Sequence, residues 1–353
     1  MAKVDLNDAR QRLAQIPREQ IGFFPTPLHR LDNLSKDLGI SLYLKRDDLS
    51  GPSTFGGNKV RKLEYLLADA KRLGAEYVIT YGATQSNHAM LTAIASSRAG
   101  LRPVLFLTAV VPPDPKDLRG NLLLDHVLGA EIHILPMQPG MSMADASAAR
   151  YESAKLRIME LESLGHRCYK IPGGGASPVG CLAFASGYLE MMEQAQREGV
   201  DDFDYIVHAS GSGGTLAGLT AGRALSGSRA AILSFASGFK GADYASNVAD
   251  MANKALSLID CTPLVAPEDI KFDMGYVGQG YECPTDASTD AVRLFARREG
   301  VLFDPVYTSK ALAGMLEYID LGTIPKGSKV LFWHTGGVTA LFAEAAIVGD
   351  VHR

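Results

Sequence analysis

The chain has 353 residues, of which 46% are hydrophobic and 21% are charged, and its formal net charge is −4 at pH 7. This length exceeds that of a typical single domain and predicts two lobes around a large buried core. The composition is that of an ordinary globular protein, and the slight negative charge argues against nucleic acid or an anionic membrane surface as a partner.

Short β-branched runs alternate with amphipathic helical stretches, which predicts an α/β fold with parallel sheets and helices on both faces. The predicted strands are residues 42–44, 77–80, 102–107, 131–135, 168–171, 205–207, 230–235 and 329–333. The predicted helices include residues 62–73, 89–99, 120–128, 141–164, 183–198, 215–225 and 285–299. Because helix 141–164 is polar on most faces, we expect it on the outside of the molecule.

The run Gly173-Gly174-Gly175 fits a point where the chain crosses between two lobes, although a plain loop fits equally well. With this division, residues 49–172 would form a smaller domain. Residues 1–48 and 173–353 would together form a larger one.

The first motif that carries chemistry is Gly56-Gly57-Asn58-Lys59-Val60-Arg61-Lys62. The two glycines lack the Cβ atoms that would keep a planar group away from the backbone. A lysine desolvated beside them loses some preference for its charged form, and as a neutral amine it can form a Schiff base. Lys62 follows one helical turn later on the same face, where a cation could meet a phosphate. By itself the motif also fits a solvated helix start.

A second polar turn, Thr84-Gln85-Ser86-Asn87-His88, stands between strand 77–80 and helix 89–99. Its hydroxyl and amide groups at a helix start suit a carboxylate. The alternative is an ordinary N-cap made by Ser86 or Asn87. His88 taken alone fits a capping or packed histidine better than a base.

A third motif, Ser210-Gly211-Ser212-Gly213-Gly214-Thr215, joins strand 205–207 to helix 215–225. Free N–H groups and hydroxyls at a helix start are suited to bind a phosphate. The motif lacks the Lys-Ser/Thr of a P-loop and the acidic residue of a dinucleotide site, so a phosphate monoester fits better. A small-residue loop without a ligand is the alternative.

The amino terminus and the cysteines bear on the cellular setting. The first residues lack the apolar core of a secretory signal, and no run approaches the roughly 20 apolar residues that cross a bilayer. The four cysteines, Cys168, Cys181, Cys261 and Cys283, lack metal-binding spacing. We therefore expect free thiols, no metal, no membrane partner and a cytoplasmic location.

Together the three motifs resemble those of the fold type II enzymes that use pyridoxal 5′-phosphate (PLP), the tryptophan synthase β-subunit superfamily. Within it, the chain is similar to D-cysteine desulfhydrases and 1-aminocyclopropane-1-carboxylate (ACC) deaminases. The resemblance covers nearly the whole chain and extends to Thr26-Pro27-Leu28, Lys45-Arg46-Asp47-Asp48, Asp304-Pro305-Val306-Tyr307 and His334-Thr335-Gly336-Gly337. It implies two lobes of three-layer αβα type, PLP as cofactor, a small amino acid as substrate and a homodimer.

The resemblance also assigns roles to individual residues. The expected cofactor-binding residues are Lys59 (the Schiff-base lysine), Lys62, Asn87, Ser212, Gly213, Gly214, Thr215, Tyr307 and Thr308. The expected substrate-binding residues are Gln85, Ser86, Asn87, His88 and Tyr281. The expected catalytic residues are Lys59, Ser86, Tyr281 and Tyr307.

Thr308 bears on which reaction of this branch the chain catalyses. The ACC deaminases that the chain resembles carry a glutamate at this position, facing the pyridine nitrogen of the cofactor. A carboxylate keeps that nitrogen protonated, so the ring can accept an electron pair, which opening a cyclopropane requires. A hydroxyl leaves the nitrogen largely unprotonated. The resemblance and Thr308 therefore favour β-elimination, with D-cysteine giving pyruvate, ammonia and hydrogen sulfide.

Alternatives remain. Met90 stands where D-cysteine desulfhydrases commonly carry arginine, which leaves L-cysteate, releasing sulfite, as the second substrate hypothesis. Its sulfonate would need donors, which Ser53, Thr54, Thr84 or His88 could supply. ACC deamination ranks below both. A PLP-binding carrier or an amino-acid sensor is the hypothesis outside catalysis.

Overall fold

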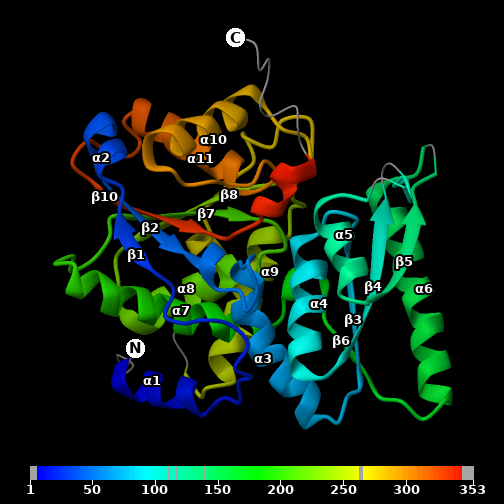
Figure 1. The fold of residues 1–353 in the computed structure, drawn as a ribbon. Coiled ribbons are helices and arrows are strands. Elements are labelled where there is room, and N and C mark those ends of the chain that lie inside the picture. Colours follow the sequence, from blue (N-terminus) through cyan, green and yellow to red (C-terminus); the bar gives the residue numbers. More distant parts are fainter. Residues whose placement is uncertain (1–5, 110–111, 117, 139, 262–264, 344–353) are drawn as a thin grey trace.

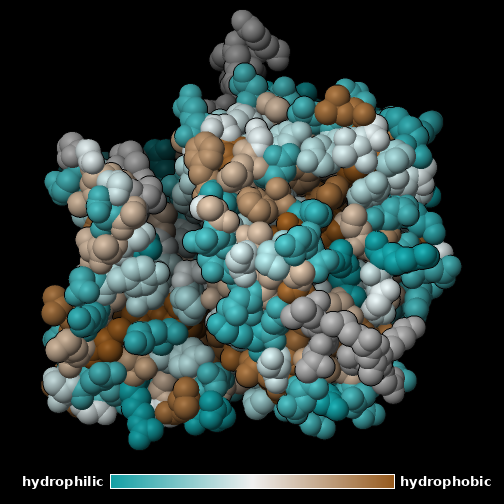
Figure 2. All heavy atoms as spheres, turned by 180° about the vertical axis from the view of Figure 1, so that it is seen from behind, coloured by the Kyte–Doolittle hydropathy of each residue, from teal (hydrophilic) through white to brown (hydrophobic). Residues whose placement is uncertain are grey.

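The computed structural model describes residues 6–109, 112–116, 118–138, 140–261 and 265–343. Residues 1–5, which enter the expectation that no secretory signal is present, lie outside this part of the chain. Two sheets form two lobes that lie side by side (Figure 1). Seen from behind, hydrophilic residues cover most of the surface and apolar residues appear in small groups (Figure 2).

The larger sheet has the strand order β1-β2-β10-β7-β8-β9. The edge strand β1 (Leu28–Arg30) runs antiparallel to β2 (Ser41–Arg46), and the other pairings are parallel. The remaining strands are β10 (Lys329–His334), β7 (Tyr205–Ser210), β8 (Ala231–Ala236) and β9 (Phe272–Asp273).

Helices cover both faces of this sheet, because its strands alternate apolar side chains between two cores. In β10, Leu331 and Trp333 join one core with α7 (Pro178–Arg197), α8 (Gly214–Ser226) and α9 (Tyr244–Ser257). Val330 and Phe332 join the other core with α10 (Asp286–Glu299) and α11 (Thr308–Asp320). Two further helices are α1 (Leu6–Gln15) and α2 (Asp32–Leu38).

The smaller sheet is wholly parallel, with the order β5-β4-β3-β6. Its strands are β3 (Tyr77–Ala83), β4 (Arg102–Ala109), β5 (Glu131–Pro136) and β6 (Cys168–Lys170). Leu105 and Leu107 pack with α4 (Asn87–Ala99) and α5 (Gly120–Val127). On the opposite face, Val104 and Phe106 pack with α6 (Met143–Ser163).

The helix α3 (Asn58–Arg72) joins the lobes, since it contacts both α7 of the larger lobe and α4 of the smaller one. The chain returns to the larger lobe through the short 3₁₀ turn Gly173–Gly175. The smaller sheet falls within the expected smaller domain, while the domain boundaries themselves stay a prediction. None of the described helices has the length and apolarity needed to cross a bilayer.

The α/β class with parallel sheets and two lobes is confirmed, and all eight predicted strands are present. The prediction omitted β1 and β9, which span three and two residues and are too short to show alternation. It also placed the start of α3 too late, at Lys62 instead of Asn58. Helix α7 begins at Pro178, five residues before the predicted start, because Ser177 caps it and proline is tolerated in the first turn.

Candidate active site

A cavity of about 680 Å³ lies between the lobes, at the carboxyl ends of strands from both sheets. Ligands commonly bind at this edge of parallel sheets. The expected site residues that line the cavity are Lys59, Ser86, Asn87, His88, Ser212, Gly213, Thr215, Tyr281 and Tyr307. The other four, Lys62, Gln85, Gly214 and Thr308, do not line it.

The turn before Lys59 is held by a close approach of two chain segments. Gly57 forms a bridge with Gly336, and Asn58 N donates to the Thr335 carbonyl at 3.0 Å. A methyl group on Gly57 would lie 2.8 Å from that carbonyl oxygen, and one on Gly336 would lie 2.6 Å from the Gly56 carbonyl oxygen. Glycine is therefore needed here so that two backbone segments can lie in contact. The reason expected from the sequence was instead the approach of a planar group.

The Lys59 side chain, in the first turn of α3, is half-buried and lines the cavity. Burial lowers its pKa well below the ordinary lysine value, and the neighbouring Lys62 lowers it further, while Asp304 raises it. Lys59 Nζ donates to Asn58 Oδ1 at 2.9 Å, and Asn58 Nδ2 donates to Thr215 Oγ1 at 3.0 Å. An amine whose preference for the charged form is reduced in this way is suited to nucleophilic attack on a carbonyl.

The expected phosphate site lies at the start of α8. Gly213, with φ of 87°, precedes the first helical residue Gly214, so the N–H groups of this turn have no intrahelical acceptors. Lys62 Nζ lies 3.0 Å from the position that a methyl group on Gly214 would take, and it donates to the Gly174 carbonyl at 3.1 Å. Burial lowers the Lys62 pKa to about 8. A helix start beside a lysine fits a phosphate.

The second polar turn begins α4. Ser86 is the N-cap, its Oγ accepting from Ala89 N at 3.2 Å, and it also lines the cavity. The side chain of Gln85 turns away to the start of α5, donating to the Arg119 carbonyl at 3.1 Å and accepting from Asn121 N at 2.9 Å. Gln85 thus supports the turn from behind, whereas Ser86 is at the surface of the cavity.

Asn87 has its amide orientation set by a neighbour that sequence reasoning missed. Asn87 Oδ1 accepts from Asn121 Nδ2 at 2.8 Å, and Asn121 Oδ1 accepts from Thr339 Oγ1 at 2.6 Å. The Asn87 NH₂ group is therefore the part left to donate to a ligand. No local pattern marks Asn121, because a single asparagine at a helix start is common.

His88 is packed in the protein, as expected from the sequence for this residue taken alone, and it also lines the cavity. Thr80 Oγ1 donates to the Ile171 carbonyl at 3.0 Å, so it accepts from His88 Nε2 at 2.8 Å. Burial lowers the His88 pKa well below its usual value, with Lys59 and Lys62 lowering it further, so the ring is neutral. Met90, two residues later, is 1% exposed in a core with Val60 and Leu63 and does not line the cavity.

Two tyrosines meet in the wall of the larger lobe. The hydroxyls of Tyr281 and Tyr307 contact each other by a short hydrogen bond, and the ring centroids lie 5.7 Å apart at 66°. Burial raises the pKa of each phenol above its usual value, so both are neutral and can donate a proton. This disfavours a tyrosinate as the resting base.

Thr308 begins α11 and is fully buried. Its Oγ1 donates to Asp304 Oδ1 at 2.5 Å and accepts from Asp304 N at 3.0 Å. The same carboxylate accepts from Tyr307 N at 2.6 Å, so Asp304 organises the start of the helix. The role of Thr308 opposite a pyridine nitrogen stays a prediction.

Several residues of the wall were not expected from the sequence, and they include Asn58, Arg150 and Lys240. Arg150 is on α6, which was expected on the outside, and it reaches the cavity from the first half of that helix. Lys240 follows β8, donates to the Gly211 carbonyl at 2.8 Å, and has its pKa lowered to about 8 by burial. Single cations in otherwise ordinary stretches carry no sequence signal. The donors proposed for a sulfonate, Ser53, Thr54 and Thr84, do not line the cavity.

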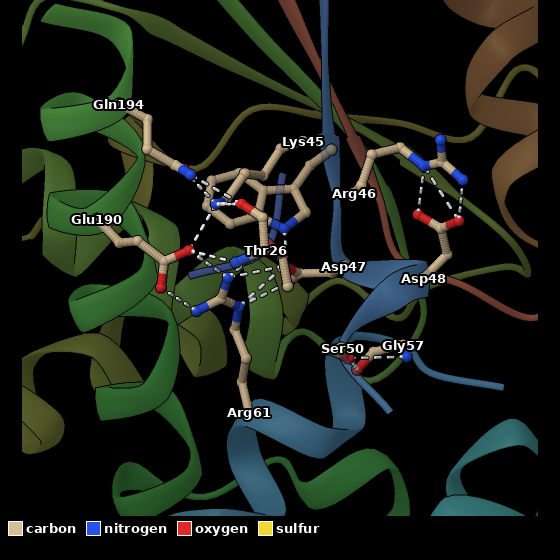
Figure 3. A network of polar contacts seen from close by, with 11 residues as sticks. Thr26, Lys45, Arg46, Asp47, Asp48, Ser50, Gly57, Arg61, Glu190 and Gln194 are labelled. Carbon is tan, nitrogen blue, oxygen red and sulfur yellow. Dashed lines mark hydrogen bonds and ion pairs between the residues drawn. The ribbon is translucent and has the colours of Figure 1, made fainter. Parts of the chain in front are cut away.

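A buried polar network anchors the helix that carries Lys59 (Figure 3). Arg61 donates to Asp47 and Glu190, and Lys45 also donates to Glu190 at 2.5 Å. Asp47 further accepts from Thr26 Oγ1 at 2.8 Å. These contacts join the first turn of α3 to the short turn that follows β2 and to α7. The motifs Thr26-Pro27-Leu28 and Lys45-Arg46-Asp47-Asp48 therefore support the site structurally.

Comparisons with known proteins agree with this geometry. Residues 20–336 match the family described as pyridoxal-phosphate dependent enzyme. The chain is 36% identical over 339 residues to a D-cysteine desulfhydrase of Klebsiella pneumoniae, covering 94% of this chain and 98% of that one. It is 35% identical over 343 residues to a 1-aminocyclopropane-1-carboxylate deaminase of Burkholderia multivorans, covering 96% and 99%. A crystal structure of an ACC deaminase homologue superposes with a TM-score of 0.84 at 35% identity, covering 97% and 98%.

Proposed function

Because this chain belongs to the pyridoxal-phosphate-dependent enzymes, as a fold type II lyase with PLP as its cofactor, we propose that it catalyses β-elimination from a small amino acid. D-cysteine is the substrate expected first, giving pyruvate, ammonia and hydrogen sulfide. The observation that carries the proposal is that the Lys59 amine, with its lowered pKa, shares one cavity with the neutral Tyr281–Tyr307 pair. The Lys59 amine can accept a proton in this cavity while a phenol of the tyrosine pair donates one.

PLP, when bound, supplies an electrophilic carbon for the substrate amine and a ring that delocalises the electrons of the broken Cα–H bond. Its phosphate would be held by the start of α8 and by Lys62, and Asn87 Nδ2 would donate to its ring oxygen. The substrate carboxylate would lie at the start of α4, beside Ser86.

The protein side chains then move protons. Lys59 Nζ, with its lowered pKa, takes the Cα proton, and the bond from Cβ to sulfur breaks with its electron pair leaving on sulfur. A phenol of the Tyr281–Tyr307 pair donates a proton to the departing group.

Thr308 supports elimination over ACC ring opening. Its hydroxyl hydrogen is committed to Asp304 Oδ1, and no carboxylate stands at position 308 to keep a pyridine nitrogen protonated. Relatives of both names are similar to the chain, so the distinction rests on this position.

A panel of substrates tests the proposal. Purified protein loaded with PLP is given D-cysteine, L-cysteine, L-cysteate, β-chloro-D-alanine and ACC, and keto acid, sulfide and sulfite are measured separately. We expect pyruvate and sulfide from D-cysteine. Sulfite from L-cysteate without sulfide from D-cysteine would replace D-cysteine by the second hypothesis. Bound PLP without keto acid from any of them would instead favour a carrier or sensor.

We also propose a cytoplasmic homodimer. The described cysteines are free thiols and no described helix could span a bilayer. Light scattering on the purified protein gives its mass directly, and a mass of one chain at micromolar concentration would contradict the dimer.

A further inference from the structure

Arg150 is a cation in the wall of the cavity, contributed by the smaller lobe. One of its terminal nitrogens donates to the Gly82 carbonyl at 3.0 Å and to Thr108 Oγ1 at 3.2 Å. The other lies 3.4 Å from Ser147 Oγ. The guanidinium is also 5.9 Å from the centre of the Tyr81 ring. These contacts hold the guanidinium in one place, which limits the entropy lost when a ligand binds.

The described part of the chain offers Arg150 no counter-ion. Among the described residues, no carboxylate lies within ion-pair distance of Arg150, and its buried Nε has no hydrogen-bond partner. Arg157, two turns later on the same helix, pairs instead with Glu131 and Glu160. Arg150 is half-buried and keeps its positive charge, so an anion that enters the cavity gains by lying beside it.

The position of Arg150 separates it from the other anion sites. The phosphate site is in the larger lobe, at the start of α8. The start of α4, at Ser86, is available for the substrate carboxylate. Gly82, whose carbonyl accepts from Arg150, packs against Ser86, because a methyl group on Gly82 would lie 2.6 Å from Ser86 Oγ. Arg150 therefore lies next to the position proposed for the substrate carboxylate, but it is not part of the start of α4.

We propose that Arg150, with Thr108 and Ser147, forms a subsite for a second acidic group on the substrate, attached at its β-carbon. The inference rests on the proposed β-elimination and adds a substrate class beside D-cysteine: amino acids whose β-substituent is an oxyanion, such as a sulfonate. With L-cysteate, the Cα proton goes to Lys59 and the Cβ–S bond breaks with its electron pair on sulfur. The sulfur leaves as sulfite, which takes up a proton to give bisulfite, and hydrolysis of the remaining three-carbon unit gives pyruvate and ammonium.

The kinetic test compares two substrate classes in the PLP-loaded enzyme. Arg150→Gln is expected to lower kcat/KM for L-cysteate by about 10- to 100-fold, the loss of one charge-assisted hydrogen bond, mainly through KM. The ratio of kcat/KM for L-cysteate to that for β-chloro-D-alanine should fall at least tenfold, and Arg150→Lys should restore part of it. Arg157→Gln, on the same helix, is the control and should leave the ratio unchanged. Equal losses for both substrates, or no loss for L-cysteate, would overturn the subsite.

A binding test stands apart from elimination. Aspartate and asparagine have the same shape, differ in charge, and have no leaving group on Cβ. We expect one enantiomer of aspartate to perturb the cofactor absorbance at a concentration at least tenfold lower than the matching asparagine does. Arg150→Gln should abolish this difference. Equal affinities in the native enzyme would overturn the subsite even if elimination is observed. Preference for aspartate with no elimination from any substrate would instead contradict the proposed function and retain the subsite.

Discussion

Lys59 and Asn58 are adjacent in the first turn of α3, and the lysine amine donates to the asparagine side-chain oxygen at 2.9 Å. The Asn58 amide donates in turn to Thr215 at the start of α8. One asparagine therefore links the amine that would bind the cofactor carbon to the helix that would bind its phosphate. The two ends of the expected cofactor site are positioned by a single side chain.

Asn58→Ala should weaken PLP binding about tenfold, equivalent to about 1.4 kcal/mol, because Thr215 and the Lys59 amine both lose a buried partner. Equilibrium dialysis of PLP against the purified variant measures the effect. Asn253→Ala, which removes an amide that bonds to Val265 instead, is the control outside the site. Unchanged PLP affinity in Asn58→Ala would show that the link is dispensable.

Lys59→Ala should abolish turnover and covalent attachment of PLP, because no other amine takes its place in the turn. Borohydride reduction followed by peptide mass spectrometry locates the modified lysine. Lys71→Ala, at the far end of the same helix, should keep both properties. Normal pyruvate formation by Lys59→Ala would refute the assignment.

ACC should be turned over far more slowly than D-cysteine, because Thr308 cannot keep a pyridine nitrogen protonated. The measurement is α-ketobutyrate released from ACC by the PLP-loaded enzyme. Thr308→Glu need not create the activity, since ring opening also needs a placed acid. Comparable rates for the two substrates in the native enzyme would contradict the electronic argument.

Asp47→Asn should lower the free energy of unfolding by about 3–5 kcal/mol, because it leaves the buried Arg61 without its carboxylate partner. Urea denaturation monitored by the fluorescence of Trp333, whose Nε1 donates to Asp47 at 2.8 Å, reports the loss. Asp48→Asn, which affects the more exposed pair with Arg46, should cost less. Equal losses would mean that burial does not govern the network.

Asp125 should make stability depend on pH. Burial raises its pKa to about 8, and neither carboxylate oxygen has a hydrogen-bond partner. Below about pH 4 the carboxyl is neutral in both the folded and unfolded states. As pH rises towards 8, the unfolded state loses the proton and the folded state keeps it, so stability falls. Asp125→Asn should therefore raise Tm at pH 8 more than at pH 5, as thermal unfolding at the two values would measure. An equal change at both would contradict the raised pKa.

Two motifs of the site were recognisable because their signal is local. Lys59 and the Gly213-Gly214 turn each lie where a regular element begins, so a few neighbouring residues identify them. The substrate-binding role given to Gln85, and the departure from arginine noted at Met90, depend on the resemblance and have no such local signal. Gln85 turns towards α5, and Met90 packs in a core beneath α4, because neighbouring elements compete for these side chains.

The sequence by itself determined the α/β class, the eight main strands, the PLP family and the order of the motifs, because each depends on periodicity or on residues adjacent in the chain. Only the tertiary structure brought Arg150 into the cavity wall and Asn121 behind it, against Asn87. It also placed the glycines of residues 56–57 against those of residues 336–337. These contacts join segments far apart in the chain. They depend on how the two sheets and α3 pack, and such packing contacts produce no periodic pattern in the sequence from which they could be predicted.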